Sequence, residues 1–187
     1  QSRAVRLDDR RDPSNKGSFR HYMLKEIYEQ PETVAATLEE RITDKRVLKR
    51  AFGVDAPAIF ARVRAVQIVA CGSSYYTSLV ARYWVEQLTG LPCSVEIASE
   101  IRYRKAAIVP DTLLVIISQS GETADTLAAL RHAEGYLASL CICNVPNSTL
   151  VRESDLSLMI HAGPEIGVAS TKAFTNQLTD LILLTLA

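Results

Sequence analysis

Between residues 66 and 160, short apolar runs alternate with longer segments whose apolar positions recur at helical spacing. The apolar runs predict five strands, at residues 66–70, 93–97, 113–117, 138–145 and 156–160. The run 113–117 is apolar at every position, which is typical of a strand covered on both faces in a parallel sheet. We therefore expect this run to form a central strand.

The segments between the strands predict helices. After the first strand, apolar residues repeat at helical spacing from Tyr76 to Leu88, and Gly90 stops the helix. Further helices are expected near 100–105, at 123–134 and from 169 to the end of the chain. Strands that alternate with helices at this spacing indicate βαβ units. The fold class predicted is a three-layer α/β/α sandwich around a five-stranded parallel sheet of flavodoxin-like order.

A helical arm is expected before the first strand. Residues 1–18 are rich in charge and turn formers, so they are interpreted as a linker or disordered arm. A helix follows at 19–29, Pro31 interrupts it and opens a second helix that passes Ile42, and a third covers 56–62. The predicted organisation is therefore a linker at 1–18 and a single domain at 19–187 that includes these helices.

Composition and charge narrow the function classes. The 187 residues are 48% hydrophobic and 22% charged, which is a globular composition, and the formal net charge is zero. A neutral chain offers no basic field for nucleic acid or for an anionic membrane. The longest apolar run, 181–187, is too short to span a bilayer, and its abrupt end suggests a fragment of a longer protein. No signal peptide opens the chain, so a cytoplasmic location is expected.

The four cysteines are interpreted as thiols in a reducing compartment. Cys93, Cys141 and Cys143 lie in strand-like runs, and we expect them to be buried. Cys71 differs, because it follows a strand beside a Gly-Ser-Ser turn, where a reactive thiol is conceivable but not required. The three histidines have no carboxylate or cysteine at a spacing that suggests a metal site or a catalytic triad. No metal is expected.

Two turns rich in small hydroxyl residues are the candidate ligand site. One is 72–74, after the first strand, and the other is 118–123, after the third. In a sheet of flavodoxin-like order these strands are neighbours, so both turns face one crevice at the carboxyl edge. The second turn combines hydroxyls with Gly121 at the start of a helix, which suits a phosphate held without Lys or Arg. The alternative is that these residues only form turns and cap helices.

Several cofactor classes are disfavoured. Neither turn carries a dinucleotide or nucleoside-triphosphate fingerprint. The fold leaves a flavin mononucleotide site open, although no aromatic residue lies in the 118–123 turn to flank a flavin ring. A third segment, 165–172, either starts the last helix with a hydroxyl cap and Lys172 on the solvent face, or closes over a ligand.

Three strings of residues together resemble the sugar-isomerase (SIS) domain. They are Cys71-Gly72-Ser73-Ser74-Tyr75, Ser118-Gln119-Ser120-Gly121-Glu122-Thr123-Ala124-Asp125-Thr126 and Glu165-Ile166-Gly167-Val168-Ala169-Ser170-Thr171-Lys172-Ala173-Phe174-Thr175. With the stretches 21–31 and 96–104, they are similar to the first of two SIS domains in the glutamine:fructose-6-phosphate aminotransferase (glucosamine-6-phosphate synthase) family. The resemblance covers residues from about 19 to the end.

The resemblance implies a cofactor-free conversion of fructose 6-phosphate and glutamine to glucosamine 6-phosphate and glutamate. The residues it implies for the phosphate are Ser74, Ser118, Gln119, Ser120 and Thr123. Those it implies for the sugar are Ser73, Val168 and Ser170, although the family usually has Thr in place of Ser73. Its implied partners are a glutaminase domain, a second SIS domain and a second copy in a homodimer.

The resemblance places the catalytic Glu, His and Lys of the family outside this chain. No catalytic residue is therefore assigned here, and we expect the fragment to bind sugar phosphate without turning it over. Glu122 and Glu165 are the only carboxylates in the candidate loops; Glu122 is expected in the first turn of a helix, and Glu165 is the one candidate base. The alternatives are a non-catalytic sugar-phosphate sensor in a regulator and a flavodoxin-like redox domain.

Overall fold

A computed structural model describes residues 15–101, 103 and 106–187. Most of the predicted linker at 1–18, together with Arg102, Arg104 and Lys105, lies outside the described residues. The strands are β1 Ala65–Ala70, β2 Cys93–Ile97, β3 Thr112–Ser118, β4 Ala138–Cys143 and β5 Leu156–Met159. The helices are α1 Tyr22–Leu38, η1 Lys49–Phe52 (3-10), α2 Ala56–Phe60, α3 Gly72–Thr89, α4 Ala98–Ile101, α5 Ala124–Arg131, α6 Thr149–Glu153 and α7 Lys172–Leu186.

The five strands form one parallel sheet in the order β2-β1-β3-β4-β5. This order is flavodoxin-like, as predicted. Strand β3 lies at the centre, and all of its residues are buried. The prediction of a central strand from the apolar run is therefore confirmed, because water reaches neither face of β3.

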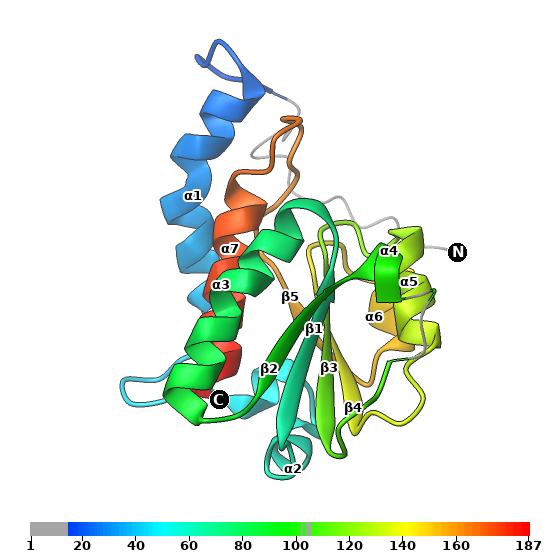
Figure 1. Ribbon diagram of the computed structural model, residues 1–187. Coiled ribbons are helices and arrows are strands. Elements are labelled where there is room, and N and C mark those ends of the chain that lie inside the picture. The colour runs from blue at the N-terminus through cyan, green and yellow to red at the C-terminus, as the bar shows by residue number, and fades with distance from the viewer. Residues whose placement is uncertain (1–14, 102, 104–105) are drawn as a thin grey trace, which may run out of the picture.

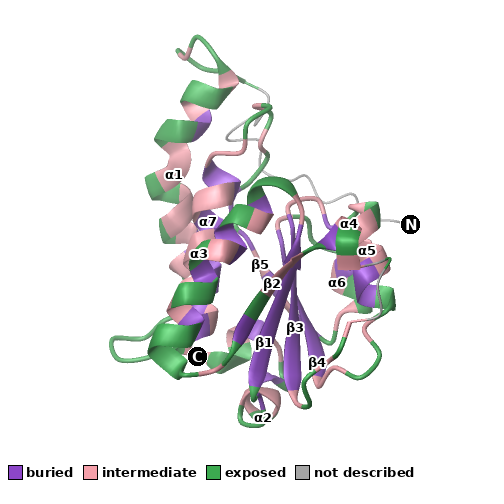
Figure 2. Ribbon diagram, viewed as in Figure 1, coloured by how far each residue is buried: buried purple, intermediate pink, exposed green. Residues whose placement is uncertain are grey.

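Helices cover both faces of the sheet, which gives three layers (Figure 1). Alternate residues of β3 point to opposite faces. Val115 packs in the cluster with residues of α3 and α7, whereas Ile116 packs with residues of α5 and α6. Burial is concentrated in the sheet and on the inward faces of these helices (Figure 2). The turns that connect each strand to the next helix lie at the carboxyl edge of the sheet.

Helix α1 is a single helix, so the prediction that Pro31 separates two helices is wrong. Proline lacks the N–H that the carbonyl four residues earlier, at Ile27, would accept. The side chain of Gln30 supplies a substitute, since its Nε2 donates to the Ile27 oxygen at 3.1 Å. A second compensation comes from packing, because the carboxyl-terminal part of α1 lies beside α7 (Figure 1). Helix α7 itself begins at Lys172, three residues later than predicted.

Candidate functional site

The two hydroxyl-rich turns meet at one pocket, as the strand order requires. Ala70 of β1 pairs with Ile117 of β3, so the chain leaves both strands side by side at the carboxyl edge. The pocket has a volume of about 270 Å³. The residues that line it are Cys71, Gly72, Ser73, Ser74, Ile117, Ser118, Gln119, Ser120, Thr123 and Thr126. Six of the eight predicted ligand-binding residues are thus brought together.

The first turn brings the start of α3 to the pocket. Gly72 has φ +58°, a left-handed conformation that favours glycine, and the helix begins at that residue. Ser73 is exposed and Ser74 is buried, so the two hydroxyls lie at different depths. Backbone N–H groups in the first turn of a helix have no partner within the helix, and they carry partial positive charge. The backbone N–H groups at the start of α3 can therefore donate hydrogen bonds to an anion.

The hydroxyls of the second turn bond to one another and to the turn itself. Ser118 Oγ lies 3.1 Å from Thr123 Oγ1 and accepts the Gly121 N–H at 3.1 Å. Ser120 Oγ accepts the Glu122 N–H at 3.2 Å. Within the described chain, Thr123 is the N-cap residue of α5 but makes no side-chain cap bond. The Ser118 and Ser120 hydroxyls therefore brace the turn, as the turn-forming alternative expects, whereas the Thr123 hydroxyl does not cap α5.

The second turn is seated on the segment that follows β4. Gly121 has φ +70°, and a Cβ there would lie 2.1 Å from Ser148 Oγ and 2.7 Å from Cys143 Sγ. The backbone oxygen of Gly121 accepts the N–H of Leu150 at 3.1 Å. Only glycine fits this close approach, which holds the hydroxyls at a fixed position.

Glu122 was predicted to lie in the first turn of α5, but it precedes that helix. Its side chain instead contacts the start of α6. Its carboxylate accepts the N–H of Thr149 at 2.7 Å. This hydrogen bond lowers the pKa of Glu122 below its usual value. A carboxylate with a lowered pKa is a weak base, so Glu122 is poorly suited to removing a proton from carbon.

Glu165 holds the start of α7. Its carboxylate accepts from Ser170 Oγ at 3.1 Å, from the Thr171 N–H at 2.8 Å and from the Ala173 N–H at 3.2 Å. The helix is therefore capped by a carboxylate, and the hydroxyl cap, which was one of the two alternatives for this segment, is not formed by the N-cap residue Thr171. Lys172 is also not on the solvent face, because it is buried and its Nζ lies 2.8 Å from Glu29 Oε2.

The two remaining predicted sugar contacts lie on the 165–171 loop. Val168 is fully exposed and Ser170 is half-buried. Neither lines the pocket formed by the other two turns. Cys71, which the sequence singled out only for its thiol, also lines the pocket. The sequence pattern missed Thr126 as a lining residue, because nothing in its immediate neighbours distinguishes it from an ordinary helix position.

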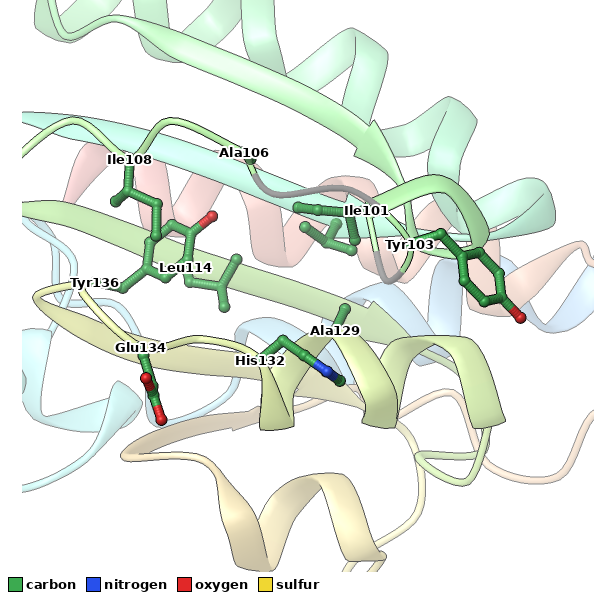
Figure 3. A pocket seen from close by; sticks show the side chains of 10 residues that line it. Ile101, Tyr103, Ala106, Ile108, Leu114, Ala129, His132, Glu134 and Tyr136 are labelled. Carbon is green, nitrogen blue, oxygen red and sulfur yellow. The ribbon is translucent and has the colours of Figure 1, made fainter.

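A second pocket, of about 400 Å³, lies on the α4–α5 side of the sheet (Figure 3). Its lining is mostly apolar but includes His132, Glu134 and Tyr136. The Tyr136 hydroxyl donates to Gln67 Oε1 at 2.7 Å. This pocket shares no lining residue with the hydroxyl-rich one, and the sequence did not predict it.

The burial of the thiols agrees with the expectation from sequence. Cys93, Cys141 and Cys143 are buried, and burial raises the pKa of Cys93 and of Cys141 to about 12. Among residues 15–101, 103 and 106–187, no group of three His, Cys, Asp or Glu side chains is placed to hold a metal ion. Over the same ranges, no helix combines the length and apolarity needed to cross a membrane.

Comparison with known proteins identifies the family. The model of the SIS domain matches residues 59–187. The chain belongs to the SIS domain family. The hydroxyl-rich pocket of this SIS domain lies inside the matched region, whereas α1 precedes it. The fold class predicted from the strand pattern is thereby confirmed.

Curated relatives narrow the resemblance. Glutamine–fructose-6-phosphate aminotransferase [isomerizing] from Pseudomonas aeruginosa is 61% identical over 188 residues, covering 100% of this SIS-domain chain and 31% of the relative. The protein of the same name from Pseudomonas syringae is 63% identical over 185 residues, covering 98% and 30%. The chain thus spans about a third of the length of these relatives, and the family resemblance read from its residues is confirmed.

A solved structure of a relative has the same fold as this chain. The C-terminal domain of glucosamine-fructose-6-phosphate aminotransferase from Francisella tularensis superposes with a TM-score of 0.87 at 54% identity. The match covers 90% of this chain and 48% of that one. The fold and the family therefore rest on agreement between sequence and coordinates.

Proposed function

We propose that this SIS domain binds the phosphate of a sugar phosphate in the pocket between the 71–74 and 118–123 turns. The observation that carries the proposal is the convergence of two helix starts, α3 and α5, on a pocket lined by serine and threonine hydroxyls. Helix starts and hydroxyls are suited to anions. Among the described residues that line the pocket none is charged, so affinity is expected to be modest and release fast.

We assign the roles within the site as the family resemblance implies. The phosphate is assigned to Ser74, Ser118, Gln119, Ser120 and Thr123. Ser73, exposed at the rim, and Val168 and Ser170 on the 165–171 loop are assigned to the sugar. Since the loop residues do not line the phosphate pocket, the sugar would extend from the pocket toward that loop.

The relatives suggest the reaction to which this binding contributes. We place the domain in the isomerase region of a glucosamine-6-phosphate synthase, which converts fructose 6-phosphate and glutamine to glucosamine 6-phosphate and glutamate. A glutaminase domain, a second SIS domain and a second copy of the chain are the proposed partners, with no nucleic acid or membrane partner. The proposed location is the cytoplasm, and no cofactor is required.

Replacing Ser118, Ser120 and Thr123 together by Ala tests the phosphate assignment. A hydrogen bond to a charged group contributes about 1.5–3 kcal/mol, so losing three should abolish measurable binding of fructose 6-phosphate and of inorganic phosphate. Calorimetry measures both affinities, and circular dichroism checks that the fold is retained. Thr43→Ala removes an exposed hydroxyl outside the pocket and serves as control. Unchanged affinity in the triple variant contradicts the assignment.

A non-catalytic sensor is the second candidate. The same pocket serves this function, and the occupied carboxylates of Glu122 and Glu165 favour binding over chemistry within this chain. An assay of the full-length protein for glucosamine 6-phosphate formation separates the two: formation supports the synthase, and binding without formation supports the sensor.

A further inference from the structure

Glu26 is a buried carboxylate that belongs to neither turn of the phosphate pocket. It lies on α1, outside the matched SIS region, and only 2% of it is exposed. Its Oε1 accepts the N–H of Ile166 at 2.6 Å and that of Gly167 at 3.0 Å. Its Oε2 is 3.2 Å from the same Gly167 nitrogen. A carboxylate from the amino-terminal helix therefore binds two consecutive backbone N–H groups about 140 residues away in the sequence.

The fit between Glu26 and the 165–171 loop leaves no spare room. A Cβ on Gly167 would lie 2.5 Å from Glu26 Oε2 and 3.3 Å from the Cα of Met23. The second distance is to backbone, which cannot swing aside as a side chain can. Gly167 is therefore required for close contact between the loop and α1.

Helix α1 is held against α7 by several contacts, so its position relative to the 165–171 loop is fixed. Four polar contacts join it and the residues that follow it to α7: Glu29 with Lys172 at 2.8 Å, Gln30 with Thr175, Thr33 with Asn176 at 3.4 Å, and Arg41 with Asp180 at 2.6 Å. The Arg41 and Asp180 side chains are both buried, which makes separation of the two costly. Figure 1 shows α1 and the loop before α7 side by side.

The 165–171 loop is thus held at two points. Glu26 holds its backbone at residues 166–167, and Glu165 ties its start to Ser170 and to the first turn of α7. Val168 and Ser170, the two proposed sugar contacts, lie just beyond the first of these points. Ordering a loop costs conformational free energy. When the loop is already ordered in the free protein, this cost does not reduce the affinity for the ligand.

We propose that Glu26 is a positioning residue that presents the 165–171 loop to the sugar. This inference rests on the proposed function, since it takes Val168 and Ser170 as sugar contacts. Glu26 itself touches no ligand. It acts through the backbone of Ile166 and Gly167, so its loss affects recognition of the sugar and spares recognition of the phosphate.

The test compares two ligands on the full-length protein. Inorganic phosphate reports on the pocket alone, whereas fructose 6-phosphate reports on the pocket and the loop together. For Glu26→Ala we expect calorimetry to show at least about a tenfold loss of fructose 6-phosphate affinity, with inorganic phosphate within about twofold of wild type. Glu26→Gln, which keeps an oxygen acceptor for the Ile166 N–H, should recover most of the loss.

Two further variants keep the test decisive. Gly167→Ala pushes the loop off Glu26 without removing the carboxylate, so it should give the same ligand pattern even if Glu26→Ala folds poorly. Glu32→Ala removes an exposed carboxylate from the same helix and should match wild type with both ligands.

The outcomes separate this inference from the proposed function. Equal losses for both ligands in Glu26→Ala and Gly167→Ala would show a general structural role and overturn the inference. Unchanged fructose 6-phosphate affinity in both variants would overturn it as well, while leaving the phosphate pocket intact. If wild-type protein binds neither ligand, the proposed function fails first, and the inference fails with it.

Discussion

Gly121 and Gly90 share a left-handed backbone conformation but differ in the space around them. Their φ values are +70° and +72°, yet a Cβ on Gly90 would meet nothing within 4 Å, whereas one on Gly121 would lie 2.1 Å from Ser148 Oγ. Comparison of the two positions separates the free-energy cost of a left-handed backbone for a residue with a Cβ from the cost of a steric clash. Gly121 is the position at which the 118–123 turn contacts the segment after β4.

Substitution by Ala at these two positions should have unequal effects. Gly90→Ala should lower the free energy of unfolding by about 1–2 kcal/mol, which is the cost of a left-handed conformation for a residue with a Cβ. Gly121→Ala should lower it by roughly 1–3 kcal/mol more, because an overpacked site must also move. Urea denaturation measures both, and equal effects would show that Ser148 and Cys143 do not confine the turn.

The cysteines should differ sharply in reactivity. Burial raises the pKa of Cys93 and of Cys141 to about 12, and Cys143 is fully buried, whereas Cys71 is half-buried at the pocket. At pH 8 we expect a chromogenic disulfide reagent to modify one thiol of four quickly, and all four in denaturant. Rapid modification of three or four thiols in the native protein would contradict the burial.

The same shifts predict how stability depends on pH. An unfolded thiol has a pKa of about 8.5, below the folded values for Cys93 and Cys141. Above about pH 8.5 the unfolded chain therefore binds fewer protons than the folded one. Their contribution to stability should be intact below about pH 8.5 and lost as the pH rises toward 12. Replacement of both cysteines by Ala should flatten this part of the stability profile.

At the scale of elements, Glu165 connects the 165–171 loop to α7. Its carboxylate accepts two backbone N–H groups and two hydroxyls, those of Ser170 and Thr171. Glu165→Ala should lower the free energy of unfolding by about 1–2 kcal/mol, as the loss of a helix cap does. Glu165→Gln should lower it less, since it retains an oxygen acceptor. Thermal denaturation that leaves both variants at the wild-type midpoint would contradict the capping role.

The sheet could be predicted because its signal is local. Five fully apolar residues at 113–117 tolerate few environments other than the centre of a parallel sheet. In a sheet of flavodoxin-like order, the first and third strands are neighbours, so the 72–74 and 118–123 turns must lie side by side. The position of the candidate phosphate pocket therefore came from strand pattern and topology together, without knowledge of any contact.

The elements that were predicted wrongly depend on contacts between distant residues. Lys172 looks like a surface residue in its own helix, and its ion pair with Glu29, 143 positions earlier, makes its burial tolerable. Pro31 normally ends a helix, and α1 continues because Gln30 satisfies the freed carbonyl and α7 supports the helix. Glu26 was missed for the same reason, since its partners at 166 and 167 lie at the other end of the chain.

For the whole molecule, we expect the 187-residue chain alone to bind sugar phosphate without turning it over. The transfer of a proton between carbons needs a free base near the substrate. Glu122 and Glu165, the carboxylates of the candidate loops, are both occupied by backbone N–H groups. The isolated chain should therefore form no glucosamine 6-phosphate from fructose 6-phosphate with glutamine or ammonia in a coupled assay. Turnover that disappears in Glu165→Gln would place catalytic machinery on this chain after all.

The most direct test of the central claim is a crystal structure of the protein with glucosamine 6-phosphate bound. We expect the phosphate to lie within hydrogen-bonding distance of the Ser118, Ser120 and Thr123 hydroxyls. We also expect the sugar to point toward Ser170. A phosphate bound elsewhere, such as in the pocket lined by His132 and Tyr136 (Figure 3), would contradict the claim.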